Sequence, residues 1–460
     1  MKRNDDASAR GRSVAAALLV CLFCWGCAGH AARTLGARTA LDEGRPKEAL
    51  ALLDEQLEVK SPADLPANVG GDNTLLLLDR AMVLQQLGSN AETLAPTEYL
   101  QSSRDLETAD KGIQVLDFSR NAVDDLGKYL FSDATGPYKA PSYEKLMVNT
   151  MNLVNYLVRG DLNGAKIEAR RFSVMQRFID EHAGHGASLL GPGSYLAGFA
   201  FEKSGSADEA LRYYDEALEY GQYGSLADPV RRLAQKGSFT SPRLRDAAGQ
   251  SQSAPADDDS AEILVVIGFG RVPAKIAKRI PIGLALTLVS GALSPNDVSR
   301  ANYLAAQGLV TWVNYPELGR PRGEWGIPYL WVDGAATDLD GALAVDAEAR
   351  KAWDDVQGSV VASAITRLIA RVAAGEVVRE TTGGGLVGAL LSLGTQATLT
   401  ATDTPDTRSW ATLPARIAIG RIRVPPGPHT LELEARGLRK RQTITLQKGG
   451  WAVMNLTVLR

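Results

Sequence analysis

The sequence of 460 residues has few of the side chains that most often carry covalent or metal chemistry. It contains 3 cysteines and 4 histidines, and Cys21, Cys24 and Cys27 all lie close to its start. If that segment is cleaved and Cys27 is modified on export, no thiol is left. A disulfide framework, a cysteine nucleophile and a cysteine-ligated metal are then excluded. Stability must come from buried cores, which a chain of this length can build in about two or three domains.

A strong excess of charge of either sign is also absent. The formal net charge is −3 and the isoelectric point is about 6.0, so the basic face expected of a nucleic-acid-binding protein is missing. The longest apolar stretch after the first residues runs from Ile280 to Leu293 and is interrupted by Pro281. A membrane-spanning helix needs about 20 apolar residues, so this stretch is too short. We expect no nucleic-acid partner and no later membrane span.

The first 27 residues have the pattern of an export signal. Basic residues between Lys2 and Arg12 precede an apolar run from Val14 to Phe23, and this order is typical of a signal peptide. Trp25-Gly26-Cys27 resembles the end of a lipobox, although Cys24 stands where an aliphatic residue is usual. We therefore predict a signal peptide over residues 1–26 and lipidation of Cys27.

Two alternatives to lipidation stay open, namely a soluble secreted protein cleaved elsewhere and a plain transmembrane anchor. The residue after the predicted anchor is Ala28, and it is not the Asp that retains some lipoproteins at the inner membrane. The sequence thus favours a location in the cell envelope, lipid-anchored to the outer membrane and facing the periplasm.

Residues 27–245 are dominated by helical periodicity interrupted by glycine. In the clearest instance Gly198 and Phe201 precede a turn, and Ala210 and Tyr214 follow on one face of the next helix. This alternation of small and large residues resembles tetratricopeptide repeats, in which paired helices approach closely. An irregular helical bundle with the same helix-turn-helix pattern is the alternative. Stacked repeats would leave a concave groove for a protein partner, and its candidate residues are Tyr156, Phe201 and Tyr214.

The composition changes at residues 246–262, which are rich in Ser, Ala, Gln and Asp and are expected to form a flexible linker. Residues 263–400 then alternate between strand and helix patterns. Buried strands are predicted at Glu262–Ile267, Leu309–Asn314 and Tyr329–Val332, with a long helix over Val345–Glu380. Residues 401–460 predict a small antiparallel β unit resembling a β-sandwich. The expected fold class is a multidomain α+β protein with an all-α N-terminal part and a C-terminal α/β region.

Several motifs resemble catalytic or ligand sites, but each lacks residues that such a site requires. Gly268-Phe269-Gly270 follows a strand but lacks the third glycine of a dinucleotide-binding loop, and Gly383-Gly384-Gly385 lacks the Lys of a phosphate-binding loop. His182 and His185 have no third metal ligand, and Asp257–Asp259 resembles solvated charge. We therefore expect no catalytic residues, no metal and no cofactor.

The segment Asp403–Pro414 carries the most specific combination of side chains. Asp406, Arg408 and Trp410 could form a bidentate ion pair capped by an aromatic ring, and a structural brace is the favoured role. Together with the lipobox-like start and Tyr143-Glu144-Lys145-Leu146, this segment resembles a family of bacterial envelope lipoproteins of uncharacterised activity. The resemblance implies N-terminal helical repeats and a C-terminal α/β region, with no activity attached.

These observations favour a non-enzymatic envelope lipoprotein that binds partner proteins of the envelope through its helical repeats, as a scaffold or as an assembly factor. The alternative is a protein that binds or acts on carbohydrate or peptidoglycan through the C-terminal region. That alternative requires a cleft with perturbed carboxylates, which the sequence does not reveal.

Overall fold

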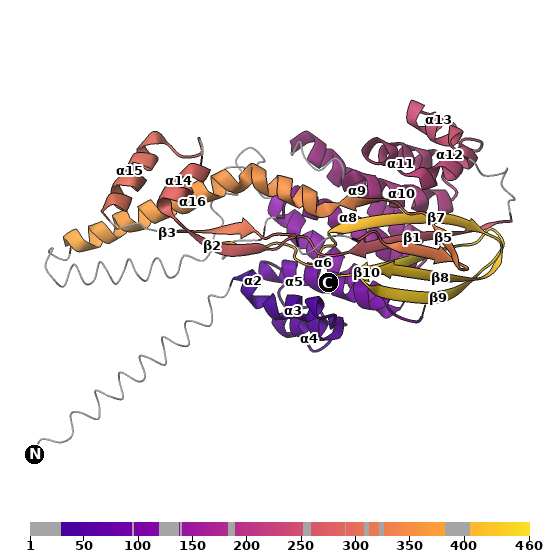
Figure 1. Ribbon diagram of the computed structural model, residues 1–460, viewed down its shortest axis with the longest axis horizontal. Coiled ribbons are helices and arrows are strands. Elements are labelled where there is room, and N and C mark those ends of the chain that lie inside the picture. The colour runs from indigo at the N-terminus through magenta and orange to yellow at the C-terminus, as the bar shows by residue number, and fades with distance from the viewer. Residues whose placement is uncertain are drawn as a thin grey trace, which may run out of the picture.

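The computed structural model describes residues 29–93, 96–118, 138, 140–182, 189–251, 259–289, 291–307, 312–321, 326–381 and 405–460. Its architecture is α+β, with most helices in the N-terminal half and most strands in the C-terminal part (Figure 1). The predicted signal peptide and Cys27 lie outside the described residues. Among the residues that are described, no helix is both long enough and apolar enough to cross a membrane.

The N-terminal half consists of helices that pack on their neighbours along the chain as antiparallel pairs. Its elements are α2 (His30–Arg33), α3 (Leu35–Asp42), α4 (Pro46–Gln56), α5 (Asp72–Ser89), α6 (Thr97–Phe118), α8 (Ser142–Val158), α9 (Leu162–His182), α10 (Leu190–Lys203), α11 (Ala207–Tyr220), η2 (Gly224–Leu226), α12 (Ala227–Leu233) and α13 (Pro242–Gly249). The most extensive contacts join α5 with α6, α8 with α9, and α10 with α11, and α3 packs on α4.

Glycines account for two features of these helix pairs. Gly160 and Gly205 adopt positive φ angles of 68° and 82° directly after α8 and α10, where a left-handed residue ends a helix at little cost. Gly198 lies inside α10, and a Cβ atom there would come within 2.5 Å of the Tyr214 ring on α11. The small and large residues recognised in the sequence therefore do face each other across a helix pair.

The strands form three sheets. They are β1 (Ala261–Phe269), β2 (Lys275–Pro281), β3 (Trp312–Leu318), β4 (Tyr329–Val332), β5 (Ala335–Thr337), β6 (Asp340–Ala344), β7 (Arg416–Val424), β8 (Gly427–Ala435), β9 (Leu438–Leu446) and β10 (Trp451–Val458). The first sheet has the order β10-β1-β7-β6, with β1 parallel to β10 and antiparallel to β7. The second pairs β2 with β3, and the third has the order β5-β4-β8-β9.

The β1 sheet lies between two other layers. Ile263 and Val265 on β1 pack with Leu431 and Leu433 on β8, which joins the first and third sheets into a sandwich. Alternate β1 residues such as Leu264 belong instead to the core of the helical half. Because both faces are covered, every residue of β1 is buried, which explains the continuous apolar run in its sequence.

Segments that the sequence predicts as separate units contribute strands to the same sheets in the structure. It predicted a separate antiparallel unit over residues 401–460, but β7 and β10 pair with β1, and β8 pairs with β4. The sandwich is therefore built from both C-terminal segments, and it contains one parallel strand pair. Helix α13 extends to Gly249, beyond the start of the predicted linker, and residues 252–258 of that linker lie outside the described residues. The helical half shares one apolar core with β1, β7 and β10.

A smaller unit, here called the arm, extends from the layered body (Figure 1). It consists of β2, β3, α14 (Ile282–Leu288), α15 (Pro295–Ala306) and most of α16 (Val345–Thr381). Ile280, Ala301, Val313 and Ile365 contribute to its own apolar core. Helix α16 agrees with the long helix predicted from the sequence, and its 37 residues give a length of about 55 Å at 1.5 Å per residue.

Candidate functional site

Two of the three residues predicted to line a groove are buried inside the protein. Tyr214 is 0% exposed and Phe201 is 4% exposed, and the Phe201 ring stacks on Tyr213 with centroids 5.3 Å apart. Tyr156 is half-buried and donates a hydrogen bond from its hydroxyl to Glu107. Phe201 and Tyr214 therefore do not line an exposed groove, because these large aromatic side chains fill the spaces between helices.

Tyr214 instead belongs to a buried ionic network where the helices meet the β1 sheet. Its hydroxyl donates to Glu202 Oε2 at 2.6 Å and accepts from Arg421 Nη1 at 2.8 Å. Arg421 on β7 also binds Glu262 on β1 with two hydrogen bonds of 2.8 Å, and it donates to Glu202 Oε1 at 2.7 Å. Lys203 completes the network through ion pairs with both glutamates.

This network keeps its carboxylates ionised although they are almost completely buried. Burial alone would raise the pKa of Glu262, but the positive charges of Arg421 and Lys203 outweigh it and hold that pKa well below its usual range. The same two cations lower the pKa of Glu202. The arrangement therefore joins the helices to the sheet through charged groups, because both carboxylates stay ionised near neutral pH.

The structure holds Asp406 and Arg408 in a bidentate ion pair. Arg408 Nε donates to Asp406 Oδ1 at 2.8 Å, and Nη2 donates to Asp406 Oδ2 at 2.7 Å. The aromatic ring beside this guanidinium is Tyr138, whose centroid lies 5.8 Å from Arg408 Cζ. Trp410 is buried in the helical core, and its backbone N–H donates to Glu144 at 3.0 Å. Glu144 belongs to the Tyr143–Leu146 motif, so the two motifs quoted for the family resemblance are in contact.

The same segment also fixes the first described residues of the chain. Thr407 Oγ1 accepts a hydrogen bond from the Ala31 backbone N–H at 3.3 Å. His30 is buried, with its Nε2 atom 3.5 Å from Asp79 Oδ2, and Asp79 accepts bonds from Thr412. No signal in the sequence predicts these contacts, because Ala31 and Thr407 are 376 positions apart.

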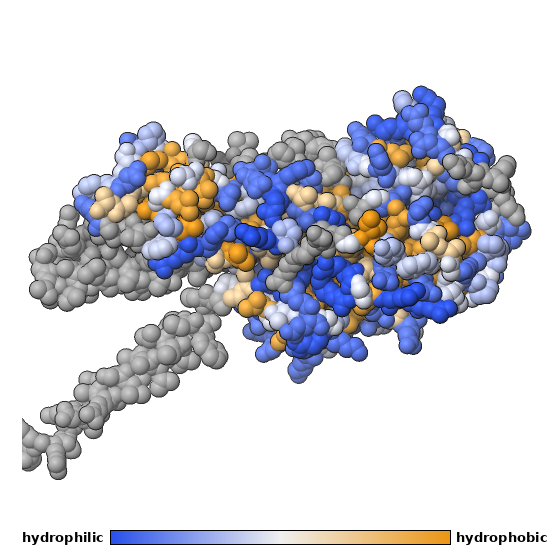
Figure 2. Space-filling model, in the orientation of Figure 1, coloured by the Kyte–Doolittle hydropathy of each residue, from blue (hydrophilic) through white to orange (hydrophobic). Residues whose placement is uncertain are grey.

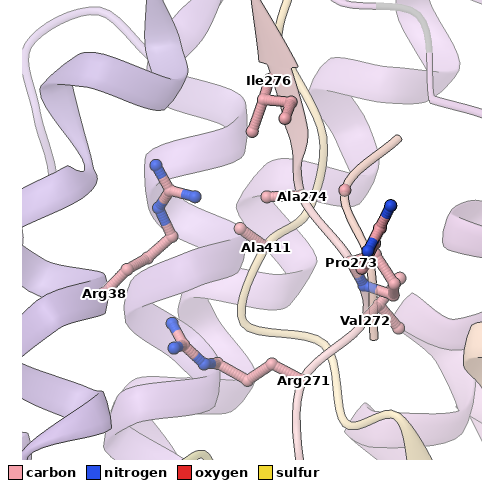
Figure 3. A pocket seen from close by; sticks show the side chains of 9 residues that line it. Arg38, Arg271, Val272, Pro273, Ala274, Ile276 and Ala411 are labelled. Atoms are coloured by element: carbon pink, nitrogen blue, oxygen red, sulfur yellow. The ribbon is translucent and has the colours of Figure 1, made fainter. Parts of the chain in front are cut away.

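A cleft opens beside this junction, with a volume of about 210 Å³. Figure 3 shows Arg38 entering it from a helix and Arg271 from the segment after a strand, with the small side chains of Ala274 and Ala411 between them. Those elements are α3 and β1. The residues that line the cleft are Arg38, Arg271, Val272, Pro273, Ala274, Ile276, Gly319, Arg320 and Ala411.

Backbone hydrogen bonds fix the walls of this cleft. The Val272 N–H donates to Leu413 O at 2.9 Å, and the Lys275 N–H donates to Ser409 Oγ at 3.1 Å. The Gly319 N–H donates to Ala274 O at 2.9 Å, which continues the pairing of β3 with β2. A Cβ atom at Gly319 would lie 3.0 Å from that oxygen, so glycine permits the close approach that places Arg320 at the cleft.

The cleft is positively charged. Three of its lining residues are arginines from separate segments, and none of the nine is acidic. Arg271 forms an ion pair with Asp42, which is outside the lining, and Arg38 donates to the Ala31 carbonyl oxygen. Arginines that converge from separate segments are suited to binding an anion. Sequence reasoning missed this site because Arg38, Arg271 and Arg320 occur in no recognisable motif.

The remaining motifs are placed as follows. Gly270 ends β1 with a φ of 66°, and the residues after it lead to β2, so no helix follows as a dinucleotide-binding loop would require. Asp259 pairs with Lys448. Asp257, Asp258, His185 and the Gly383–Gly385 motif lie outside the described residues, and the described part of the chain contains no group of three potential metal ligands.

Comparison with known proteins adds no family to this picture. No protein-family model and no curated protein matches the chain.

Proposed function

We propose that this chain is a non-enzymatic cell-envelope lipoprotein, anchored through lipid on Cys27, that serves as a scaffold or assembly factor for another envelope protein. The outer membrane, with the protein facing the periplasm, is the location that this proposal implies. The helix pairs are proposed to be tetratricopeptide-like, since small residues such as Gly198 face aromatics such as Tyr214 across a pair. The proposal rests chiefly on an exposed apolar surface on the arm.

That surface combines helix α14 with two elements that it contacts, namely α15 and β3. Leu284 on α14 is 52% exposed, Tyr303 on α15 is 61% exposed and Trp312 on β3 is 43% exposed. Figure 2 shows apolar side chains gathered on this part of the molecule. Single exposed apolar residues are common, but a group of them on a small projecting unit is typical of a protein-binding surface.

Helix α9 offers a second exposed surface, where a partner would bind if it used the helical half. Ile167 and Val174 are seven residues apart and therefore lie on one helical face, and both are exposed. Since the predicted groove residues Phe201 and Tyr214 are buried, α9 is the part of the helical half that we test against the arm.

Site-specific photocrosslinking in intact cells separates the two surfaces. A photoreactive residue at Leu284 or Tyr303 should crosslink the partner, while one at the exposed control position Arg245 on α13 should not. Crosslinks from Ile167 or Val174 alone would place the partner on the helical half. Absence of any specific crosslink at all four positions would contradict the scaffold proposal.

The lipid anchor is tested separately by Cys27→Ser. The wild-type chain should fractionate with membranes and incorporate labelled fatty acid, whereas the variant should lose the label. Equal labelling of the two chains would contradict lipidation at Cys27.

A second candidate function, binding of envelope carbohydrate, rests on Tyr329 and Trp331. Their rings stack on each other with centroids 5.6 Å apart, on the outer face of the third sheet, and Tyr329 is exposed. Exposed aromatic faces can stack on sugar rings through C–H contacts. Peptidoglycan fragments should then quench the fluorescence of the protein, and Trp331→Ala should abolish the effect whereas Trp312→Ala should not.

A further inference from the structure

We propose that the arginine cleft binds a phosphate group, and that the headgroup of a neighbouring phospholipid supplies it. The first part stands on the cleft alone, whereas the second rests on the proposed lipid anchor at Cys27.

The chemistry of the cleft selects a compact anion with several oxygens. Arg38, Arg271 and Arg320 come from α3, from the segment after β1 and from the segment after β3. A phosphate group has oxygens in tetrahedral directions, so it can accept hydrogen bonds from three sides at once. Arginine also binds phosphate with paired N–H groups. A planar carboxylate presents only two oxygens and uses this arrangement less completely.

Hydrogen bonds within the protein fix the walls of the cleft. They join the 272–275 segment to Leu413 and Ser409, and they join Gly319 to Ala274. Arg350 on α16 also donates to the Gly319 carbonyl oxygen at 3.1 Å. Binding would therefore require little ordering of the backbone, which keeps its entropic cost low.

The position of the cleft brings it near the predicted anchor. Arg38 donates to the carbonyl oxygen of Ala31, which follows Cys27 by four positions, and Thr407 fixes the Ala31 N–H. Four extended residues span at most about 14 Å. If Cys27 carries lipid, the cleft must lie within a short distance of the membrane surface, where phospholipid phosphates are concentrated.

Calorimetric titration with inorganic phosphate tests the site itself, using the full chain in neutral detergent. Arg320→Gln and Arg38→Gln should each weaken binding about tenfold or more, because each removes a charge-assisted contact. Arg245→Gln, an exposed arginine on α13, is the matched control and should bind as the wild type does. Thermal unfolding of each variant checks that the fold is retained, and Arg320 is exposed, so its substitution is the less disruptive of the two.

Two results of this titration would overturn the phosphate site. One is no detectable binding to the wild-type chain, and the other is equal binding by the wild type and a folded Arg320→Gln variant. Neither result depends on the lipid anchor or on a protein partner, so the scaffold proposal would be unaffected.

The source of the phosphate is tested by repeating the titration in lipid nanodiscs. In discs of phosphatidylcholine, whose headgroup carries a phosphate but no net charge, headgroups should occupy the cleft and weaken the binding of added phosphate about tenfold relative to neutral detergent. The Cys27→Ser chain, kept in neutral detergent, should bind inorganic phosphate as the wild type does. Equal phosphate binding in the discs and in neutral detergent would overturn the headgroup assignment and identify soluble phosphate as the ligand.

Discussion

Replacing Arg421 by methionine should show how strongly the helical half is bound to the β1 sheet. Arg421 is almost fully buried and donates four hydrogen bonds, two to Glu262 and one each to Glu202 and Tyr214. Methionine has a similar length but cannot donate, so the change leaves two buried carboxylates without their main cation.

The expected cost follows from what remains around those carboxylates. Breaking a buried ion pair by removing one partner typically costs about 3–5 kcal/mol, because the other charge stays buried. Lys203 still pairs with both glutamates, and Arg232 still reaches Glu262 at 3.1 Å. We therefore expect a loss near 3 kcal/mol, the lower end of that range. This is a large share of the roughly 5–15 kcal/mol by which a typical domain is stable.

Urea unfolding followed by circular dichroism at pH 7 measures this loss. The control is Arg245→Met, at an exposed arginine on α13, which should change the free energy of unfolding by less than about 0.5 kcal/mol. A double variant that adds Glu202→Gln should recover at least half of the loss, because it removes one stranded carboxylate and leaves Lys203 paired with Glu262. A single variant that loses less than about 1 kcal/mol, or a double variant that is less stable than the single one, would refute the reasoning.

Three further predictions address other parts of the molecule. Gly198→Ala should destabilise the protein by about 1–3 kcal/mol in the same urea assay, since its Cβ would overlap the fixed Tyr214 ring. Gly283→Ala, at an open position, is the control and should not destabilise it. Equal urea midpoints for the two variants would exclude the close contact at Gly198. Burial raises the pKa of Glu168 to about 7, so this side chain is protonated in the folded state but ionised in the unfolded state between about pH 4.5 and 7, and its contribution to stability falls as pH rises through that window. As the pH rises from 4.5 to 8, the free energy of unfolding of Glu168→Gln should increase by up to about 3 kcal/mol relative to that of the wild type. A stability difference between the two chains that is independent of pH would contradict the raised pKa. Finally, cleavage at a protease site introduced in residues 252–258 should leave two fragments that co-elute in size-exclusion chromatography, since the halves share one apolar core; separation without denaturant would show that they fold independently.

Local sequence patterns predicted much of the secondary structure. Helix α16 was predicted within one residue of its observed end, because apolar residues at helical spacing persist over its whole length. The β-branched run at Glu262–Ile267 lies within β1. The bidentate pair of Asp406 and Arg408 was also foreseen, since its partners are two positions apart and need no knowledge of the fold.

Roles that depend on distant residues were predicted poorly. Phe201 and Tyr214 were correctly placed on facing helices but were interpreted as a binding surface, because periodicity does not show whether another layer covers a face. A lysine next to a turn is expected to be exposed, yet Lys203 pairs with Glu262 on a strand 59 positions away. The Arg38, Arg271 and Arg320 cleft had no signal in the sequence at all.

The sequence alone therefore determined the helical character of the first half, the strand-rich character of the second half, and the glycine turns between paired helices. These features depend on interactions within a few residues, where propensity and periodicity act. The tertiary structure alone decided that β1 lies between two layers, that Arg421 binds a glutamate 159 positions away, and that three distant arginines share one cleft. Such contacts form only after apolar burial has brought remote segments together, so they depend on the whole chain and cannot be read from any single segment.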